Sequence, residues 1–135
     1  MLKYMLDTNI VIYVIKRRPT EVLEVFNRHA AQMCISSITF AELIHGAEKS
    51  AWLEHNLRQV EDFISRLEVL DYGTKAASHY GEIRADMERK GTPIGVNDLH
   101  IAGHARSEGL IMVTNNLREF KRVKGLRLEN WVSQL

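Results

Sequence analysis

The sequence contains few of the residues that build cross-linked, proline-rich or fibrous proteins. It has one cysteine and two prolines among 135 residues. A single cysteine excludes an internal disulfide, and Cys34 lies in an apolar run from 33 to 35, where a buried, inert thiol is expected. With 45% hydrophobic and 26% charged residues, the composition is that of an ordinary globular protein. The length predicts a single domain over residues 1–135.

Long hydrophobic runs are also absent. The longest, Ile10 to Ile15, is far shorter than the roughly 20 residues that span a bilayer. The first residues do not show the basic and then apolar pattern of a secretory leader. We therefore expect a cytoplasmic protein without a membrane partner.

Charge of one sign is not in excess either. The net charge is +1, so the field of the whole molecule gives no argument for a polyanionic partner. Two local basic clusters are compatible with phosphate contacts, one at residues 16–18 and one formed by Lys121, Arg122, Lys124 and Arg127. An ordinary solvated surface explains each cluster equally well.

Short apolar runs alternate along the chain with segments of helical periodicity. Strands are expected at 4–6, 33–35, 69–70 and 110–113, with an edge strand around 126–128. Helices are expected at 10–15, 19–27, 39–49, 53–67, 74–90 and 97–109, with a short one ending at Phe120. Asn9 is the expected cap of the first helix. Thr39 is the expected cap of the third, with Glu42 completing a capping box. This alternation predicts an α/β fold in three layers, with a central parallel sheet flanked by helices.

Polar residues stand where the predicted strands end and where one helix begins. Asp7 directly follows the first strand, and residues 114–116 directly follow the strand at 110–113. Both segments should lie at the carboxyl edge of the sheet, which is where open α/β sheets bind ligands. Asp98 begins a helix, and its dipole favours an ionised carboxylate. Glu42 either faces the same cleft or satisfies only its own helix.

Each of these acids alone is explained by a turn or a helix cap, so the argument for a site is their agreement. Carboxylates that converge without a nearby cysteine suit a hard ion such as Mg²⁺ or Mn²⁺. His100 and His104 share one helix face and offer zinc as an alternative, but no third ligand completes a zinc motif. Asp98 and His100 point about 200° apart on an ideal helix, so they are not expected to share an ion.

Four segments in order resemble the motifs of VapC toxins of the PIN-domain class, over essentially the whole chain. They are Met5, Leu6, Asp7, Thr8 and Asn9; residues 37–42 with Gly46; Pro93, Ile94, residues 95–98 and Ala102; and Val113, Thr114, Asn115, Asn116, Glu119 and Phe120. Each motif alone is weak. All four at such spacing make the resemblance specific.

The resemblance implies a PIN-like fold, a ribonuclease that depends on Mg²⁺ or Mn²⁺, a VapB-like antitoxin as partner, and a homodimer. It implies that Asp7 and Asp98 hold the metal ion and that Glu42 is a supporting acid. Many PIN domains have Asp where this chain has Asn116, and Glu119 is the candidate for the fourth acid in its place. Five further residues are expected to hold the carboxylates in position, although a simple role in turns is also open: Thr8, Asn9, Thr114, Asn115 and Asn116.

The similarity extends to an enterobacterial type of VapC across residues 33–37 and 101–120. This resemblance implies that the RNA is initiator tRNA, cut in the anticodon loop, so that translation is inhibited. Attack by water would leave 5′-phosphate and 3′-hydroxyl ends.

Three other functions share parts of this pattern. A phosphatase like the haloacid dehalogenases would use Asp7 as nucleophile, but it needs a second Asp where this chain has Asn9. A receiver-type signalling module needs an acidic pair at the first strand, and Leu6 and Asp7 do not provide one. A noncatalytic binding module with a PIN-like fold stays open, because intact acids permit catalysis without proving it.

Overall fold

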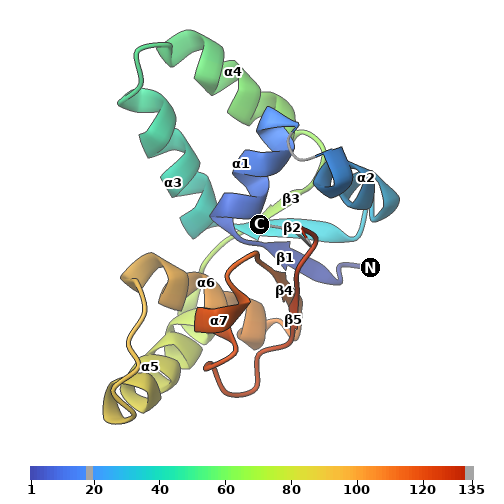
Figure 1. The fold of residues 1–135 in the computed structure, drawn as a ribbon. Coiled ribbons are helices and arrows are strands. Elements are labelled where there is room, and N and C mark those ends of the chain that lie inside the picture. Colours follow the sequence, from blue (N-terminus) through green and yellow to red (C-terminus); the bar gives the residue numbers. More distant parts are fainter. Residues whose placement is uncertain (18–19, 133–135) are drawn as a thin grey trace.

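The strands form one parallel sheet in the computed structural model, which describes residues 1–17 and 20–132 (Figure 1). The strand order is β3-β2-β1-β4-β5, and each neighbouring pair is parallel. The strands are β1 Tyr4–Leu6, β2 Met33–Ser36, β3 Glu68–Leu70, β4 Ile111–Val113 and β5 Leu128–Glu129. The helices are α1 Thr8–Lys16, α2 Thr20–Arg28, α3 Ser37–Glu48, α4 Leu53–Ile64, α5 Thr74–Arg89, α6 Val96–Ser107 and α7 Leu117–Phe120.

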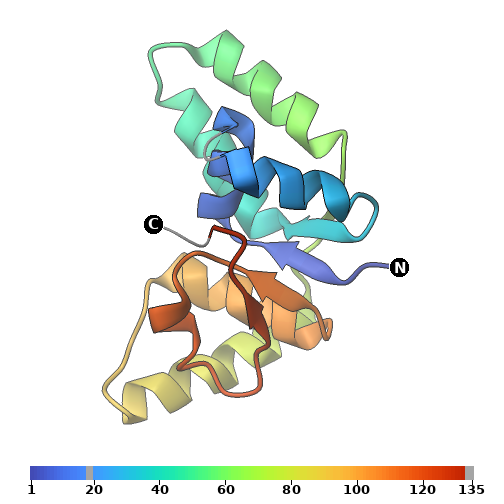
Figure 2. The same cartoon turned by 45° about the vertical axis from the view of Figure 1, so that its right-hand side comes forward.

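The sheet separates two layers of helices, and α1 to α4 lie on one face while α5 to α7 lie on the other (Figures 1 and 2). The alternation of side chains along β1 explains this division. Tyr4 and Leu6 belong to a core with α1, α2 and α4, whereas Met5 belongs to a second core with α5 and α6. The predicted three-layer α/β fold with a central parallel sheet is therefore confirmed.

The predicted strands and helices are all present, but two predicted helix caps are wrong. Asp7, not Asn9, caps α1, and its Oδ1 accepts a hydrogen bond of 2.9 Å from the backbone N–H of Ile10. Ser36, not Thr39, caps α3, because its Oγ accepts from the N–H of Ile38 at 3.1 Å. In both places the helix begins almost directly after the strand, so the cap is the first polar residue and no loop separates the elements. Glu42 therefore lies beyond the first turn and completes no capping box.

Other helix bounds differ by a few residues. The fourth helix ends at Ile64 instead of continuing to Leu67, and α6 begins at Val96 with Gly95 as its cap. Pro19, the expected start of the second helix, and Arg18 of the first basic cluster lie outside the described residues. No helix in the described part of the chain is long and apolar enough to cross a membrane.

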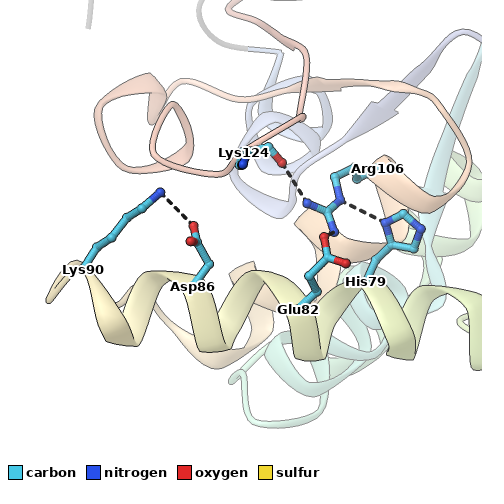
Figure 3. Close-up of polar contacts among 6 residues, drawn as sticks. All are labelled: His79, Glu82, Asp86, Lys90, Arg106 and Lys124. Carbon is cyan, nitrogen blue, oxygen red and sulfur yellow. Dashed lines mark hydrogen bonds and ion pairs between the residues drawn. The ribbon is translucent and has the colours of Figure 1, made fainter.

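Helices α5 and α6 pack very closely. A Cβ atom on Gly103 would lie 2.8 Å from the backbone nitrogen of Tyr80, so only glycine permits this approach. Beside this contact, Arg106 of α6 joins three partners (Figure 3). Its guanidinium donates to His79 Nδ1 at 2.9 Å, to Glu82 Oε1 at 2.6 Å and to the Lys124 carbonyl at 2.8 Å. The Arg106 cluster, defined by these four residues, fixes the segment after α7 onto the helical layer.

Candidate active site

The four predicted acids come from four different elements. Asp7 is the only residue between β1 and α1, Glu42 lies in α3, Asp98 is in the first turn of α6, and Glu119 is in α7. Strands β1 and β4 are neighbours, and the Asp7 backbone N–H donates to the Val113 carbonyl at 2.9 Å. This places Asp7 at the carboxyl edge of the sheet, as predicted.

Asp7 is almost completely buried, with 4% of its surface exposed. Burial raises the pKa of its carboxyl group to about 6. Hydrogen bonds from the Thr114 side chain and the Ile10 N–H oppose this rise, while the negative charges of Asp98 and Glu42 add to it. Burial is the main cause of the raised pKa, and the smaller contributions of Asp98 and Glu42 indicate that both carboxylates lie near Asp7.

Asp98 is half-buried and connects the remaining acid to this group. Its pKa is raised first by burial and then by the charges of Glu42 and Glu119. A Cβ atom on Gly95 would lie 3.5 Å from Asp98 Oδ2, an ordinary van der Waals contact, so this carboxylate lies beside the cap of its own helix. The structure thus brings Asp7, Glu42, Asp98 and Glu119 into one negatively charged region.

Glu42 is held by the two elements on either side of it. Thr8 Oγ1 donates to Glu42 Oε1 at 2.5 Å, and Asn97 Nδ2 donates to Oε2 at 3.3 Å. Thr8 also contacts Thr39 Oγ1 at 3.3 Å. Of the two open alternatives for Glu42, the structure shows that it faces the other acids and does not cap its own helix.

The other polar residues of the site differ in how closely they approach the acids. Thr114 hydrogen-bonds to the Asp7 side chain, and its Oγ1 accepts from the Asn116 N–H at 2.9 Å. Asn115 donates to the Tyr13 hydroxyl at 3.0 Å, and its buried Oδ1 has no partner among the described residues. Asn9 is exposed, and its side chain forms no hydrogen bond with any residue in the described part of the chain.

Sequence reasoning missed two participants, Asn97 and Tyr13. Asn97 precedes Asp98 within the third motif, so its position next to an acid was the only available signal. Tyr13 lies 102 positions before Asn115, and only the packing of α1 beside β4 brings the two side chains together.

The carboxylate oxygens of the four acids are suitable ligands for a hard divalent cation. None of the four forms an ion pair with a described residue, so buried negative charge stands without a protein cation to balance it. Among residues 1–17 and 20–132, no three His, Cys, Asp or Glu side chains converge closely enough to enclose one ion. Mg²⁺ is commonly held by one or two carboxylates together with waters and substrate phosphates, so this open arrangement suits it.

The zinc alternative at His100 and His104 finds no geometric support. His100 Nδ1 lies 2.7 Å from the Tyr72 hydroxyl, and its ring stacks on Tyr80 at a centroid distance of 3.9 Å. His104 is 1% exposed, and its Nδ1 lies 2.8 Å from Ser36 Oγ. Burial lowers the pKa of both histidines and so favours their neutral forms. These contacts explain both histidines as residues that pack within the fold.

Comparisons with known proteins agree with this geometry. A sequence profile described as PIN domain matches residues 4–126. The chain is 65% identical to Ribonuclease VapC2 of Haemophilus influenzae, over 98% of this chain and 100% of the relative. It is 62% identical to the tRNA(fMet)-specific endonuclease VapC of Salmonella typhimurium, over 97% and 99%. The fold superposes with a TM-score of 0.94 on a chain of DNA-bound VapBC from Salmonella typhimurium, at 61% identity and with coverage of 98% and 100%.

Proposed function

Because the chain belongs to the PIN-domain family, as one of its VapC ribonuclease toxins, we propose that it hydrolyses initiator tRNA at a phosphate bound through a metal ion that Asp7 and Asp98 would hold. The observation that carries this proposal is the group of four carboxylates, in which Asp98 is repelled by Glu42 and Glu119 and Asp7 by Asp98 and Glu42, with no cation as partner among the described residues. Such a group is costly to fold unless a ligand balances its charge. A metal ion together with an RNA phosphate is a ligand of this kind.

The substrate proposal goes beyond the class of enzyme. Its support is the printed name of the Salmonella relative, which specifies tRNA(fMet), together with 62% identity over nearly all of both chains. Initiator tRNA cut in the anticodon loop could no longer start translation, which accounts for toxicity. The exposed side chains of Lys121, Arg122 and Lys124 are available for contacts to the tRNA backbone.

In the proposed site, Asp7 and Asp98 hold Mg²⁺ or Mn²⁺. When bound, this ion would neutralise a nonbridging phosphate oxygen and stabilise the charge that develops in the transition state. Thr114 and the Ile10 N–H keep the Asp7 carboxylate in place. Asn115 and Asn116 are proposed to hold the loop that carries Thr114, and Asn9 to contact RNA.

Glu42 and Glu119 are proposed to orient the attacking water. Thr8 and Asn97 leave both Glu42 oxygens only partly occupied, since each oxygen has a further lone pair to accept a hydrogen bond from water. The water oxygen forms a bond to phosphorus while the bond to the 3′ oxygen breaks. The proton that the water loses is returned at the 3′ oxygen. The products are then a 3′-hydroxyl and a 5′-phosphate.

We further propose that a VapB-like antitoxin inhibits the enzyme by placing a basic side chain at the acids, because the unpaired carboxylates attract a cation. The support is that related chains are found in DNA-bound VapBC complexes, from Salmonella typhimurium and, as VapBC2, from Rickettsia felis, a chain of which superposes with a TM-score of 0.91 at 43% identity. We propose a homodimer of single-domain chains, residues 1–135, that acts in the cytoplasm, where tRNA is found.

The alternative functions are not supported. The PIN profile covers 123 residues from 4 to 126, and relatives that share 60% to 65% of their residues with this chain are ribonucleases by name. A phosphatase related to haloacid dehalogenases, a receiver module and a noncatalytic binding module therefore have no observation in their favour.

The test is to induce the protein alone, as an Asp98→Asn variant, and together with a VapB-like antitoxin. We expect growth arrest and cut initiator tRNA only with the wild-type protein alone. Purified protein in Mg²⁺ should cut the tRNA in the anticodon loop, and sequencing of the ends should show 5′-phosphates. Arrest that persists with Asp98→Asn, or intact tRNA during arrest, would contradict the proposal.

A further inference from the structure

A groove leads away from the acids between α1, α3 and α4. Its volume is about 280 Å³, and it begins at Thr8 and Glu42, the hydrogen-bonded pair of the site. Apolar side chains such as Ile12 line it. Gly46, Asn56 and Gln59 contribute to its outer part. The groove is therefore continuous with the region where the RNA phosphate is proposed to bind.

Gly46 is not explained by the packing of the chain. It lies inside α3, where glycine costs about 0.5 to 1 kcal/mol relative to alanine. A Cβ atom at this position would meet nothing within 4 Å, whereas at Gly103 it would collide with the backbone of α5. The missing side chain leaves open space in the groove, one helical turn (about 6 Å) beyond Glu42. A ligand that uses this space would explain the glycine.

The size and lining of the groove favour a flat, partly polar ligand. A volume of about 280 Å³ leaves room for one planar ring system. The walls are largely apolar. The amide of Gln59 is exposed and has no hydrogen-bond partner among the described residues. Unstacked bases in RNA are recognised by this combination of apolar faces and amide groups.

We propose that the groove binds one unstacked nucleobase of the RNA strand, next to the phosphate that is cut, and that Gly46 provides the room for it. The base lies between apolar side chains of α1 and α3. Its polar edge faces the amides of Asn56 and Gln59. This assignment rests on the proposed ribonuclease function and adds a site that selects the nucleotide.

The test fills the groove by substitution of Gly46 and uses a matched control. Gly81 also lies inside a helix, is exposed, and has nothing within 4 Å of its missing Cβ atom. Gly46→Ala and Gly81→Ala should both raise the melting temperature, because alanine is the better helix former. Gly46→Leu should lower kcat/KM for tRNA cleavage about ten- to a hundredfold, which is the effect of losing one base contact, while Gly81→Leu should leave it within about twofold.

A second substrate separates loss of a base contact from general damage. The second substrate is an RNA that lacks only the base next to the cut phosphate. The wild-type enzyme should cleave it with a kcat/KM lower by about the factor that Gly46→Leu shows on intact RNA. Gly46→Leu should lose little more on this substrate, since the contact is already absent. Fluorescence of 2-aminopurine placed at that position should change on binding to the Asp98→Asn protein and not to the Asp98→Asn, Gly46→Leu protein.

Each outcome decides between specific alternatives. Equal cleavage by Gly46→Leu and wild type overturns the nucleobase site while the ribonuclease proposal stands. If that variant cleaves normally but escapes the antitoxin, the groove binds a peptide side chain instead. A wild-type protein that cuts no RNA in Mg²⁺ would overturn both proposals. Additive losses on the base-deleted RNA would show that Gly46 acts elsewhere.

Discussion

The acidic region, which consists of Asp7, Glu42, Asp98 and Glu119, differs from the Arg106 cluster in whether its charges are balanced by other residues of the chain. Arg106 is largely buried, with 13% of its side chain exposed, and each of its three guanidinium nitrogens donates to an acceptor on α5 or the C-terminal segment (Figure 3). At the carboxyl edge of the sheet, Asp7 and Asp98 are also withdrawn from water, yet their charged neighbours are other carboxylates. Charge that is matched within the chain stabilises the fold. Charge left unmatched is available to a ligand.

Removal of the unmatched charge should have the largest effect, and this effect should fall on activity. Asp98→Asn should reduce cleavage on the order of 1,000-fold or more, since a bound metal ion supplies several kcal/mol of transition-state stabilisation. Asp7→Asn should do the same. Single-turnover cleavage in Mg²⁺ is the measurement, and circular dichroism checks the fold. Asp86→Asn is a matched control, because Asp86 forms an exposed pair with Lys90 at 2.9 Å. Near-normal cleavage by folded Asp98→Asn would refute the metal assignment.

Removing the matched charge should instead affect stability. Arg106→Ala should lower the free energy of unfolding by about 2 to 4 kcal/mol, because its partners lose their donor and the guanidinium leaves a gap. Arg106→Lys should not restore stability, since one ammonium group cannot reach three acceptors on different segments. Urea denaturation measures both. Lys90→Ala, at an exposed pair, should cost less than about 1 kcal/mol. A small loss in Arg106→Ala would contradict the distinction between the two regions.

The unmatched charge should make the stability of the metal-free protein depend on pH. The pKa of Asp7 is about 6 in the folded chain, above its ordinary value of 3.8. Ionisation therefore destabilises the fold as pH rises from about 4 through 6. Asp7→Asn keeps the helix cap and removes the charge, so it should be the more stable protein by about 2 to 3 kcal/mol at pH 7. The difference should shrink toward pH 4.

Thermal melting with a chelator measures this difference, and Mg²⁺ should reduce it by stabilising only the wild type. Asp86→Asn again provides the control, because a hydrogen bond from Lys90 lowers the pKa of Asp86 instead of raising it. A gap between Asp7→Asn and wild type that does not vary with pH would show that the buried charge is not its cause.

The smallest expected effect concerns the fourth acid. Glu119→Gln should slow cleavage about tenfold, because its charge acts on Asp98 and it is proposed to orient water. Asn116→Ala should change the rate about twofold, since Asn116 contacts Thr114 only through its backbone N–H. The measurement is the cleavage rate of each variant at saturating Mg²⁺. A greater loss in Asn116→Ala would transfer the fourth position to Asn116.

Local pattern was enough to predict most of the fold. The apolar run at Tyr4 to Leu6 and the helical spacing after Asp7 depend on neighbours in sequence, and both elements are present. The choice of cap was not predicted, because Asp7 and Asn9 are both good caps and the choice depends on how soon α1 starts after β1.

Contacts between distant side chains could not be predicted in this way. Glu42 is 34 positions from Thr8 and 55 from Asn97, so only the packing of α1, α3 and α6 reveals its partners. The same holds for Arg106 and His79, which are 27 positions apart. The sequence motifs indicated which acids gather. They did not indicate which neighbours orient them.

The cap formed by Asp7 has a consequence for how a ligand would bind. A free aspartate side chain rotates among several conformers, and a ligand must select one of them at a cost in conformational entropy. Here Oδ1 is already tied to the Ile10 N–H, and the carboxylate loses that freedom when α1 forms. The entropy is lost in folding and not in binding. The first turn of α1 therefore sets both the direction of the carboxylate and part of its affinity before any cation arrives.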